Sequence, residues 1–157
     1  MTSVRMFSLS TLTLCLAATA VPYASAADPI VKASLRACPT GTAIGDVGSC
    51  GKIWKIGSGE AMLHSNGKLS VQAKGLVLND ASTGEFNGTA DCVTHVVGAV
   101  LCAGAVPAQT EWSPLSKDGS ARINARLNLP GSCIAPTLVV REVRDGKVGG
   151  WLAAAGY

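Results

Sequence analysis

One stretch of the chain alternates strictly between apolar and polar residues. From Ser120 to Leu129 the sequence reads SARINARLNL, in which alanine, isoleucine or leucine occupies every second position. Successive side chains of a β-strand point to opposite faces of a sheet, so this period of two predicts a half-buried strand. Its polar face would carry Arg122 and Arg126.

Glycine-containing turns divide much of the remaining chain into short segments. Asn-Gly and Asp-Gly are the dipeptides that best adopt the positive φ angles of a two-residue hairpin loop. They predict a hairpin of residues 59–64 and 68–74 around Asn66-Gly67, and a second of residues 139–144 and 147–154 around Asp145-Gly146. A turn at 117–119 is expected to join residues 110–115 to the alternating strand, and further strands are expected at 30–36, 52–57 and 95–103.

These segments predict an all-β protein. No long segment repeats apolar residues with helical spacing, and glycine recurs too often for a long helix. About seven to nine short strands favour a two-sheet antiparallel sandwich of immunoglobulin-like type, with a small closed barrel as the alternative. We expect one domain over residues 27–157, made of a Gly-rich N-terminal strand and disulfide loop (27–51) and a sandwich body (52–157).

The first 26 residues have the layout of a secretory signal peptide. Arg5 is their only charge, the following apolar run ends at Pro22, and Ala24-Ser25-Ala26 supplies small residues for cleavage after Ala26. The run spans roughly 15 residues, short of the ~20 that a membrane-spanning helix needs. We therefore expect a secreted or periplasmic protein with no membrane insertion after the signal is removed.

Removing the leader changes both the charge and the cysteine count. The full chain holds 13 Lys and Arg, 10 Asp and Glu and six cysteines. Without Arg5 and Cys15, the net charge falls from +3 to +2 and five cysteines remain. So small a charge does not predict a nucleic-acid partner.

The five remaining cysteines are expected to form disulfides, because export leads to an oxidising compartment. Cys102 and Cys133 lie at the ends of two predicted strands and are the favoured pair; closing about 31 residues would contribute roughly 3–4 kcal/mol. Cys38–Cys50 is the second expected bridge because it closes a Gly-rich loop, and Cys50–Cys92 is its rival. Cys92 would then be the spare cysteine, whether buried, paired with another chain or reactive.

Motifs for catalysis, cofactors and metals are missing from the sequence. Cys92-x-x-His95 followed by Cys102 could supply three metal ligands, but the second close pair that is usual in structural zinc sites is missing. His64 and His95 are the only histidines; His64 is expected to face solvent and His95 to begin a strand. No nucleophile elbow, phosphate-binding loop or dinucleotide fingerprint occurs. We therefore expect no catalytic residue, no cofactor and no metal.

A surface formed by four arginines is one candidate binding surface. Arg122 and Arg126 share the polar face of the alternating strand, and Arg141 and Arg144 lie in the next hairpin. If these strands are neighbours, the sheet would present a modest positive face to an anionic polymer. The competing interpretation is ordinary solubilising charge, because acidic residues are interspersed.

The tryptophans provide another candidate surface. Trp54 and Trp151 have apolar or glycine neighbours and are expected in the core. Trp112 lies in the polar segment QTEWSP, which favours exposure. An exposed indole can stack on a sugar or pack into another protein of the cell envelope.

Several segments together resemble a group of small secreted bacterial β-sandwich proteins of uncharacterised function. The matching segments are 53–56 with Gly59, 66–69, 75–78, 95–102, 114–119, the Leu-Pro-x-x-Cys-x-Ala-Pro segment 129–136, and 150–153. The resemblance implies an immunoglobulin-like fold and a cysteine pair at Cys102 and Cys133. It implies no catalytic residues.

From the sequence we expect a secreted, disulfide-stabilised β-sandwich that binds a partner or serves in the cell envelope without catalysing a reaction. The alternative is a small exported hydrolase or a redox-active protein that uses the unpaired cysteine.

Overall fold

The computed structural model describes residues 27–156. The expected signal peptide and its cleavage site after Ala26 lie outside the described residues. In chain order the elements are β1 (Pro29–Ser34), β2 (Arg36–Ala37), β3 (Trp54–Lys55), β4 (Ser58–His64), β5 (Lys68–Lys74), β6 (Val77–Leu78), the 3-10 helix η1 (Ala81–Phe86), β7 (His95–Cys102), β8 (Ala105–Gln109), β9 (Ser113–Pro114), β10 (Ala121–Arg126), β11 (Thr137–Arg144) and β12 (Lys147–Ala155).

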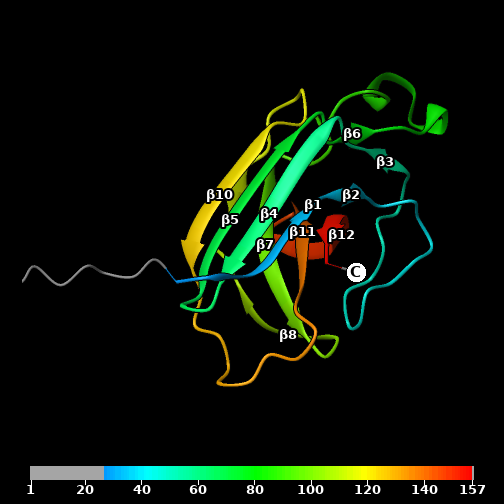
Figure 1. The fold of residues 1–157 in the computed structure, drawn as a ribbon. Coiled ribbons are helices and arrows are strands. Elements are labelled where there is room, and N and C mark those ends of the chain that lie inside the picture. The colour runs from blue at the N-terminus through cyan, green and yellow to red at the C-terminus, as the bar shows by residue number, and fades with distance from the viewer. Residues whose placement is uncertain (1–26, 157) are drawn as a thin grey trace, which may run out of the picture.

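The strands form two large antiparallel sheets in a sandwich-like arrangement (Figure 1). The four-stranded sheet has the order β1-β4-β5-β10. The six-stranded sheet has the order β2-β12-β11-β7-β8, with β9 also paired to β7. A separate pair, β3-β6, lies at one end, and no strand pairing among the described residues joins the two large sheets into a closed barrel.

The all-β prediction and both predicted hairpins are confirmed. β4 pairs with β5 around Asn66-Gly67, and β11 pairs with β12 around Asp145-Gly146. The glycines of these turns have φ angles of 79° and 72°, the left-handed region that tight hairpin turns require. The hairpin periodicity and turn chemistry therefore determine these elements locally.

Several other expected strands are shorter than the sequence suggested. The 30–36 segment is split into β1 and β2, which belong to different sheets, and only Trp54–Lys55 of segment 52–57 is a strand. The alternating strand ends at Arg126, the register partner of Lys68, because the next residue, Leu127, lies opposite Gly67 in the β4–β5 turn and donates its amide to the Gly67 carbonyl. The twelve strands within residues 27–156 therefore exceed the expected seven to nine, and β2, β3, β6 and β9 have only two residues each.

The hydrophobic core fills the space between the two sheets and continues beneath the segment between β2 and β3, where Val47 and Trp151 belong to the same buried cluster. In the four-stranded sheet Leu69 and Ile123 point inward, opposite Gly98 of β7. A Cβ atom at Gly98 would lie 3.0 Å from Leu69 Cδ2 and 3.5 Å from Ile123 Cδ1, so the sheets approach closely here. Outward positions of the same strands are polar, which explains the strict alternation in the sequence.

The Gly-rich segment between β2 and β3 packs on the six-stranded sheet, on the side away from the four-stranded sheet (Figure 1). In the middle of this segment, the amide of Asp46 donates to the carbonyl of Gly104 in the β7–β8 turn, and the carbonyl of Gly48 accepts from the amide of Trp151. The Trp151 indole Nε1 donates to the carbonyl of Thr42 at 2.8 Å. The Gly-rich segment covers the second face of β12, so this strand is buried on both faces and its C-terminal half is uniformly apolar. Among the described residues, no helix has the length and apolar character needed to cross a bilayer.

Candidate functional site

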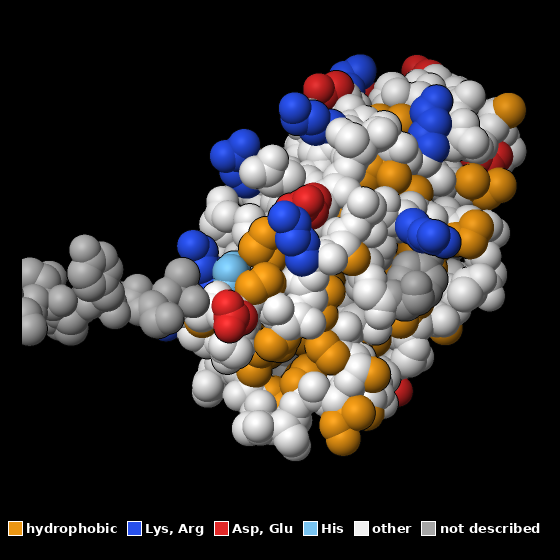
Figure 2. Space-filling model, viewed as in Figure 1, with side chains coloured by type: hydrophobic (Ala, Val, Ile, Leu, Met, Phe, Trp, Pro, Cys, Tyr) orange, Lys and Arg blue, Asp and Glu red, His pale blue; other side chains and the backbone are white. Residues whose placement is uncertain are grey.

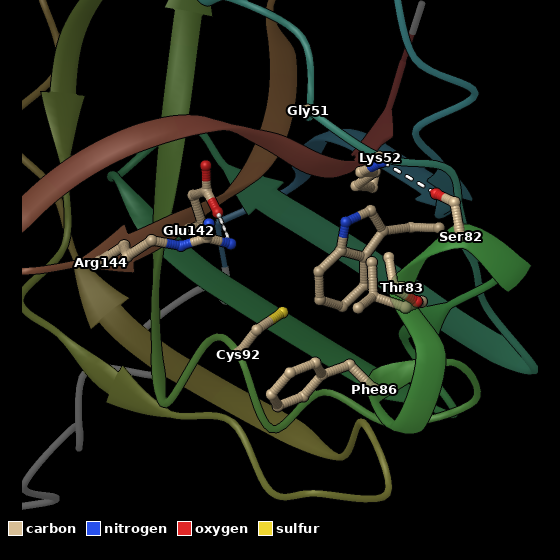
Figure 3. Close-up of a pocket in the computed structure, with 10 residues that line it drawn as sticks. Gly51, Lys52, Ser82, Thr83, Phe86, Cys92, Glu142 and Arg144 are labelled. Carbon is tan, nitrogen blue, oxygen red and sulfur yellow. Dashed lines mark hydrogen bonds and ion pairs between the residues drawn. The ribbon is translucent and has the colours of Figure 1, made fainter.

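A pocket of about 400 Å³ opens between the β3-β6 pair, η1 and the end of β11 (Figure 3). Segments far apart in the sequence contribute to it. Its lining residues are Gly51, Lys52, Trp54, Leu78, Ser82, Thr83, Phe86, Cys92, Glu142 and Arg144.

The β3-β6 pair supplies the apolar floor. Trp54 and Leu78 are register partners, and both are buried. The amide of Trp54 donates to the carbonyl of Cys38, and the amide of Asn79 donates to the carbonyl of Ile53. The floor is therefore attached to the loop that the Cys38–Cys50 disulfide closes.

The 3-10 helix η1 forms one wall. The Asp80 carboxylate caps it by accepting from the amide of Ser82 at 2.9 Å. Lys52 Nζ donates to Ser82 Oγ at 2.9 Å and lies 3.7 Å from the Asp80 carboxylate. The hydrogen bonds from Ser82 lower the pKa of Asp80, so this carboxylate remains ionised at neutral pH. Phe86 at the end of η1 is 41% exposed and its ring points into the pocket (Figure 3).

The opposite wall carries a charged pair from β11. Glu142 and Arg144 are two residues apart on one strand, so their side chains project to the same face. Arg144 Nη2 lies 3.1 Å from Glu142 Oε2, which places a donor and an acceptor side by side (Figure 3).

Cys92 lies between these walls, and its thiol is the only free one among the described residues. Burial raises the pKa of the Cys92 thiol, an effect that the nearby Arg144 charge opposes. The thiol is therefore protonated and weakly nucleophilic at neutral pH, because the thiolate is the reactive form.

We expect Cys92 to react slowly with iodoacetamide at pH 8, more slowly than a cysteine in an unfolded peptide. Arg144→Gln should slow the reaction further, because the lost positive charge no longer stabilises the thiolate. Glu142→Gln should accelerate it for the opposite reason. Alkylation followed by mass spectrometry across pH 6–10 tests this order, and a titration midpoint below the ordinary thiol range would contradict it.

The structure contains both of the disulfides that the sequence favoured. Cys38 is bonded to Cys50 and Cys102 to Cys133, which leaves Cys92 free. The metal-ligand set considered for Cys92, His95 and Cys102 is incompatible with this arrangement, because Cys102 is used in a disulfide. No cluster of three or more His, Cys, Asp or Glu side chains suited to a metal occurs within residues 27–156.

The four arginines that the sequence suggested as one positive surface do not share a sheet. Arg122 and Arg126 lie on β10 of the four-stranded sheet, whereas Arg141 and Arg144 lie on β11 of the six-stranded sheet. β10 pairs with β5, because the chain crosses between the sheets before β11 begins. Arg141 is half-buried and donates to the carbonyl of Gly149, and Arg144 belongs to the pocket.

The aromatic residues lie where the sequence indicated, with one addition. Trp54 and Trp151 are buried, and Trp112 is 51% exposed with its ring 6.1 Å from the ring of His95. Trp112 does not line the pocket; the aromatic residues that line it are the buried Trp54 and the exposed Phe86, and Phe86 is not among the candidate residues that the sequence indicated. Its one signal was an isolated aromatic side chain in the polar segment 79–91.

The two histidines lie at strand ends. His95 begins β7 as expected. His64 lies on the outward side of β4, as the alternation predicts, but it is half-buried: its Nδ1 lies 2.5 Å from the carbonyl of Ala27, because the segment before β1 packs against the β4–β5 turn.

Comparison with protein-family models, with curated proteins and with solved structures finds no match for this chain.

Proposed function

We propose that this protein is an exported, non-enzymatic binding protein whose pocket holds a neutral saccharide unit. The observation that carries the proposal is the pocket itself, in which an aromatic ring faces a side-by-side donor and acceptor (Figure 3). Its volume of about 400 Å³ falls in the range of small-ligand sites.

The two kinds of wall match the two surfaces of a sugar. A pyranose has an apolar face of C–H groups that packs on an aromatic ring, and Phe86 offers such a ring at the rim. Its hydroxyls need both donors and acceptors, which the Arg144 guanidinium and the Glu142 carboxylate supply. The hydroxyls of Ser82 and Thr83 line the η1 wall, the same wall that carries Phe86.

The balance of charge favours a neutral ligand over an anion. Arg144 is paired with Glu142, and Lys52 lies beside Asp80, so each cation at the pocket already has a carboxylate neighbour. An anionic ligand would have to compete with these carboxylates. A hydroxylated neutral ligand can bond to both members of a pair without separating them.

Export is supported by the two disulfides and by the layout of the leader. Disulfides persist in oxidising compartments, and the sequence of residues 1–26 follows the three-part secretory pattern. We infer a secreted or periplasmic location. A protein of the envelope or the extracellular space meets glycans there, which agrees with the proposed ligand.

We also infer an immunoglobulin-like topology. In that topology strands B and E pair in one sheet, strand F pairs with C and G in the other, and the chain crosses between sheets after B and after E. The pairing of β5 with β10, and of β11 with both β7 and β12, supports this order. β1 and β8 are then additions at the sheet edges.

The alternative of a hydrolase or redox protein has less support. The pocket that contains Cys92 is lined by no histidine that could activate the thiol. Its raised pKa also keeps the thiol protonated at neutral pH.

Titration of a panel of neutral monosaccharides and short oligosaccharides, followed by NMR and calorimetry, tests the proposal. Phe86→Ala and Arg144→Gln should each weaken binding of the best ligand about tenfold, through the lost ring contact and the lost charged hydrogen bonds. Ile134→Ala and Arg126→Gln are the matched controls, because Ile134 is 71% exposed and neither lines the pocket. Equal weakening in the controls, or no saccharide binding at millimolar concentration, would overturn the proposal.

A further inference from the structure

The outer face of the four-stranded sheet carries most of the unbalanced positive charge of the chain. Its outward positions alternate with the buried ones, and they hold five cations: Lys32 on β1, Lys68 and Lys74 on β5, and Arg122 and Arg126 on β10. Glu60 on β4 is the only carboxylate among the outward positions of these strands. Figure 2 shows this side of the molecule, with Lys and Arg side chains spread across it. We call these five cations the cationic face.

Charge is separated between this face and the remainder of the chain. The cationic face with Glu60 has a net charge of +4, whereas the other positions of residues 27–157 hold seven Lys or Arg and nine Asp or Glu. The net positive charge after the leader therefore comes entirely from one sheet. Evenly mixed solubilising charge would not produce this separation.

The five cations have no carboxylate partners within the described residues. Ion pairs are formed by Lys52, Lys117 and Arg144 instead, all outside this face. Lys68 and Arg126 are register partners on adjacent strands, so two positive charges stand directly opposite each other. Like charges in that position destabilise a sheet, and a bound anion between them would remove the repulsion.

The surface beside Lys74 and Arg122 is hollowed. Two open depressions of about 320 and 270 Å³ lie on either side of Gln72 and Lys74. Arg122 borders the first, and Glu60 borders the second. Ser70 Oγ donates to Asn124 Oδ1 at 3.1 Å, so amide and hydroxyl groups continue along the same face.

We propose that the cationic face binds an anionic polysaccharide that lies across β5 and β10. Lys68, Lys74, Arg122 and Arg126 would contact successive negative groups of the polymer, and Gln72 and Asn124 would bond to its hydroxyls. On strands that rise about 3.3 Å per residue, the two arginines are roughly 13 Å apart and the two lysines roughly 20 Å apart. The contacts therefore follow an extended chain, in contrast to the compact ligand proposed for the pocket.

A nucleic acid fits this face less well. Sheets that bind single-stranded nucleic acid present aromatic side chains on which bases stack. No outward position of β1, β4, β5 or β10 carries Phe, Tyr or Trp. The face offers contacts for charge and hydroxyl groups but no platform for bases.

Binding of polygalacturonate, a polymer of carboxylated sugars, to the mature protein tests the proposal, with neutral dextran and single-stranded oligothymidylate as comparisons. We expect polygalacturonate to bind, with an affinity that falls as salt rises from 50 to 200 mM, and dextran not to bind. Lys74→Gln/Arg122→Gln and Lys68→Gln/Arg126→Gln should each weaken binding about tenfold and reduce the salt dependence.

The matched control is Lys55→Gln/Lys147→Gln, which removes the same charge from exposed positions outside the face. It should leave the affinity within about twofold of the original protein. Thermal unfolding of each variant verifies that the fold is intact. Equal weakening by the control, equal binding of dextran, or tighter binding of oligothymidylate would overturn the proposal. The pocket variants Phe86→Ala and Arg144→Gln leave the cationic face intact, so failure of one proposal does not imply failure of the other.

Discussion

Replacing Trp151 by alanine is expected to lower the free energy of unfolding by about 3–5 kcal/mol, as for other large buried aromatic residues. The indole is fully buried, and it holds the Gly-rich segment through the bond from Nε1 to the carbonyl of Thr42. Loss of the ring leaves a cavity and removes that bond. Typical domains have a stability of only about 5–15 kcal/mol, so the variant should be close to unfolding at physiological temperature.

Trp151→Phe separates the two contributions. It retains most of the apolar volume but leaves the Thr42 carbonyl without this donor, and we expect a loss of about 1–3 kcal/mol. Trp112→Ala is the control, because its side chain is half exposed, and it should change stability by less than about 1 kcal/mol. Urea unfolding followed by circular dichroism measures all three. A loss in Trp151→Ala no larger than in Trp112→Ala would contradict the assigned role.

Removing the Cys102–Cys133 bridge is expected to cost about 3–4 kcal/mol, because the bridge closes a separation of 31 residues. The double variant Cys102→Ala/Cys133→Ala releases the segment between β10 and β11 from the end of β7 in the unfolded chain. Both cysteines are only partly buried, so the cavity left by their sulfur atoms adds little.

Cys92→Ala is the matched control for this double variant, since it removes a partly buried sulfur without opening a loop. Its effect should stay below about 1.5 kcal/mol. Reduction of the original protein with dithiothreitol should also lower the unfolding midpoint, through loss of both disulfides. The chain-entropy account would be refuted by a double variant that is as stable as Cys92→Ala.

The sequence predicted best where the determining interactions are local. The Asn66-Gly67 and Asp145-Gly146 turns determine their hairpins through backbone conformation, and the alternation around Ile123 identifies a strand with one buried face. The favoured disulfide at Cys102 and Cys133 followed from the ends of such strands. These features depend on few residues outside the segments themselves.

The sequence predicted poorly where distant segments determine the outcome. No local pattern shows that β10 pairs with β5 in one sheet while β11 pairs with β7 in the other, so the expected grouping of Arg122 with Arg141 was wrong. The split of segment 30–36 between two sheets depends on β4 and β12 in the same way. The β7–β8 hairpin was missed because Ala103, which rarely adopts a positive φ angle, occupies its turn with φ at 51°.

The candidate pocket could not be identified from the sequence for a related reason. Phe86, Glu142 and Arg144 come from a short 3-10 helix and the end of a strand, which a fold with non-consecutive neighbours brings together. The cationic face is likewise formed by three strands of one sheet. In each case the sequence shows the residue types, but it does not show which of them lie side by side in the folded protein.

The bond between Trp151 and Thr42 also constrains the order in which the protein can fold. It joins residues 109 positions apart, and β12 lies between β2 and β11 in the six-stranded sheet. Because the chain is synthesised from its N-terminus, it cannot complete this sheet or fix the Gly-rich segment in place until β12 has been made. Such dependence on distant contacts slows folding and keeps the growing polypeptide unfolded for longer. An unfolded chain is the form in which a polypeptide can be threaded through a narrow channel.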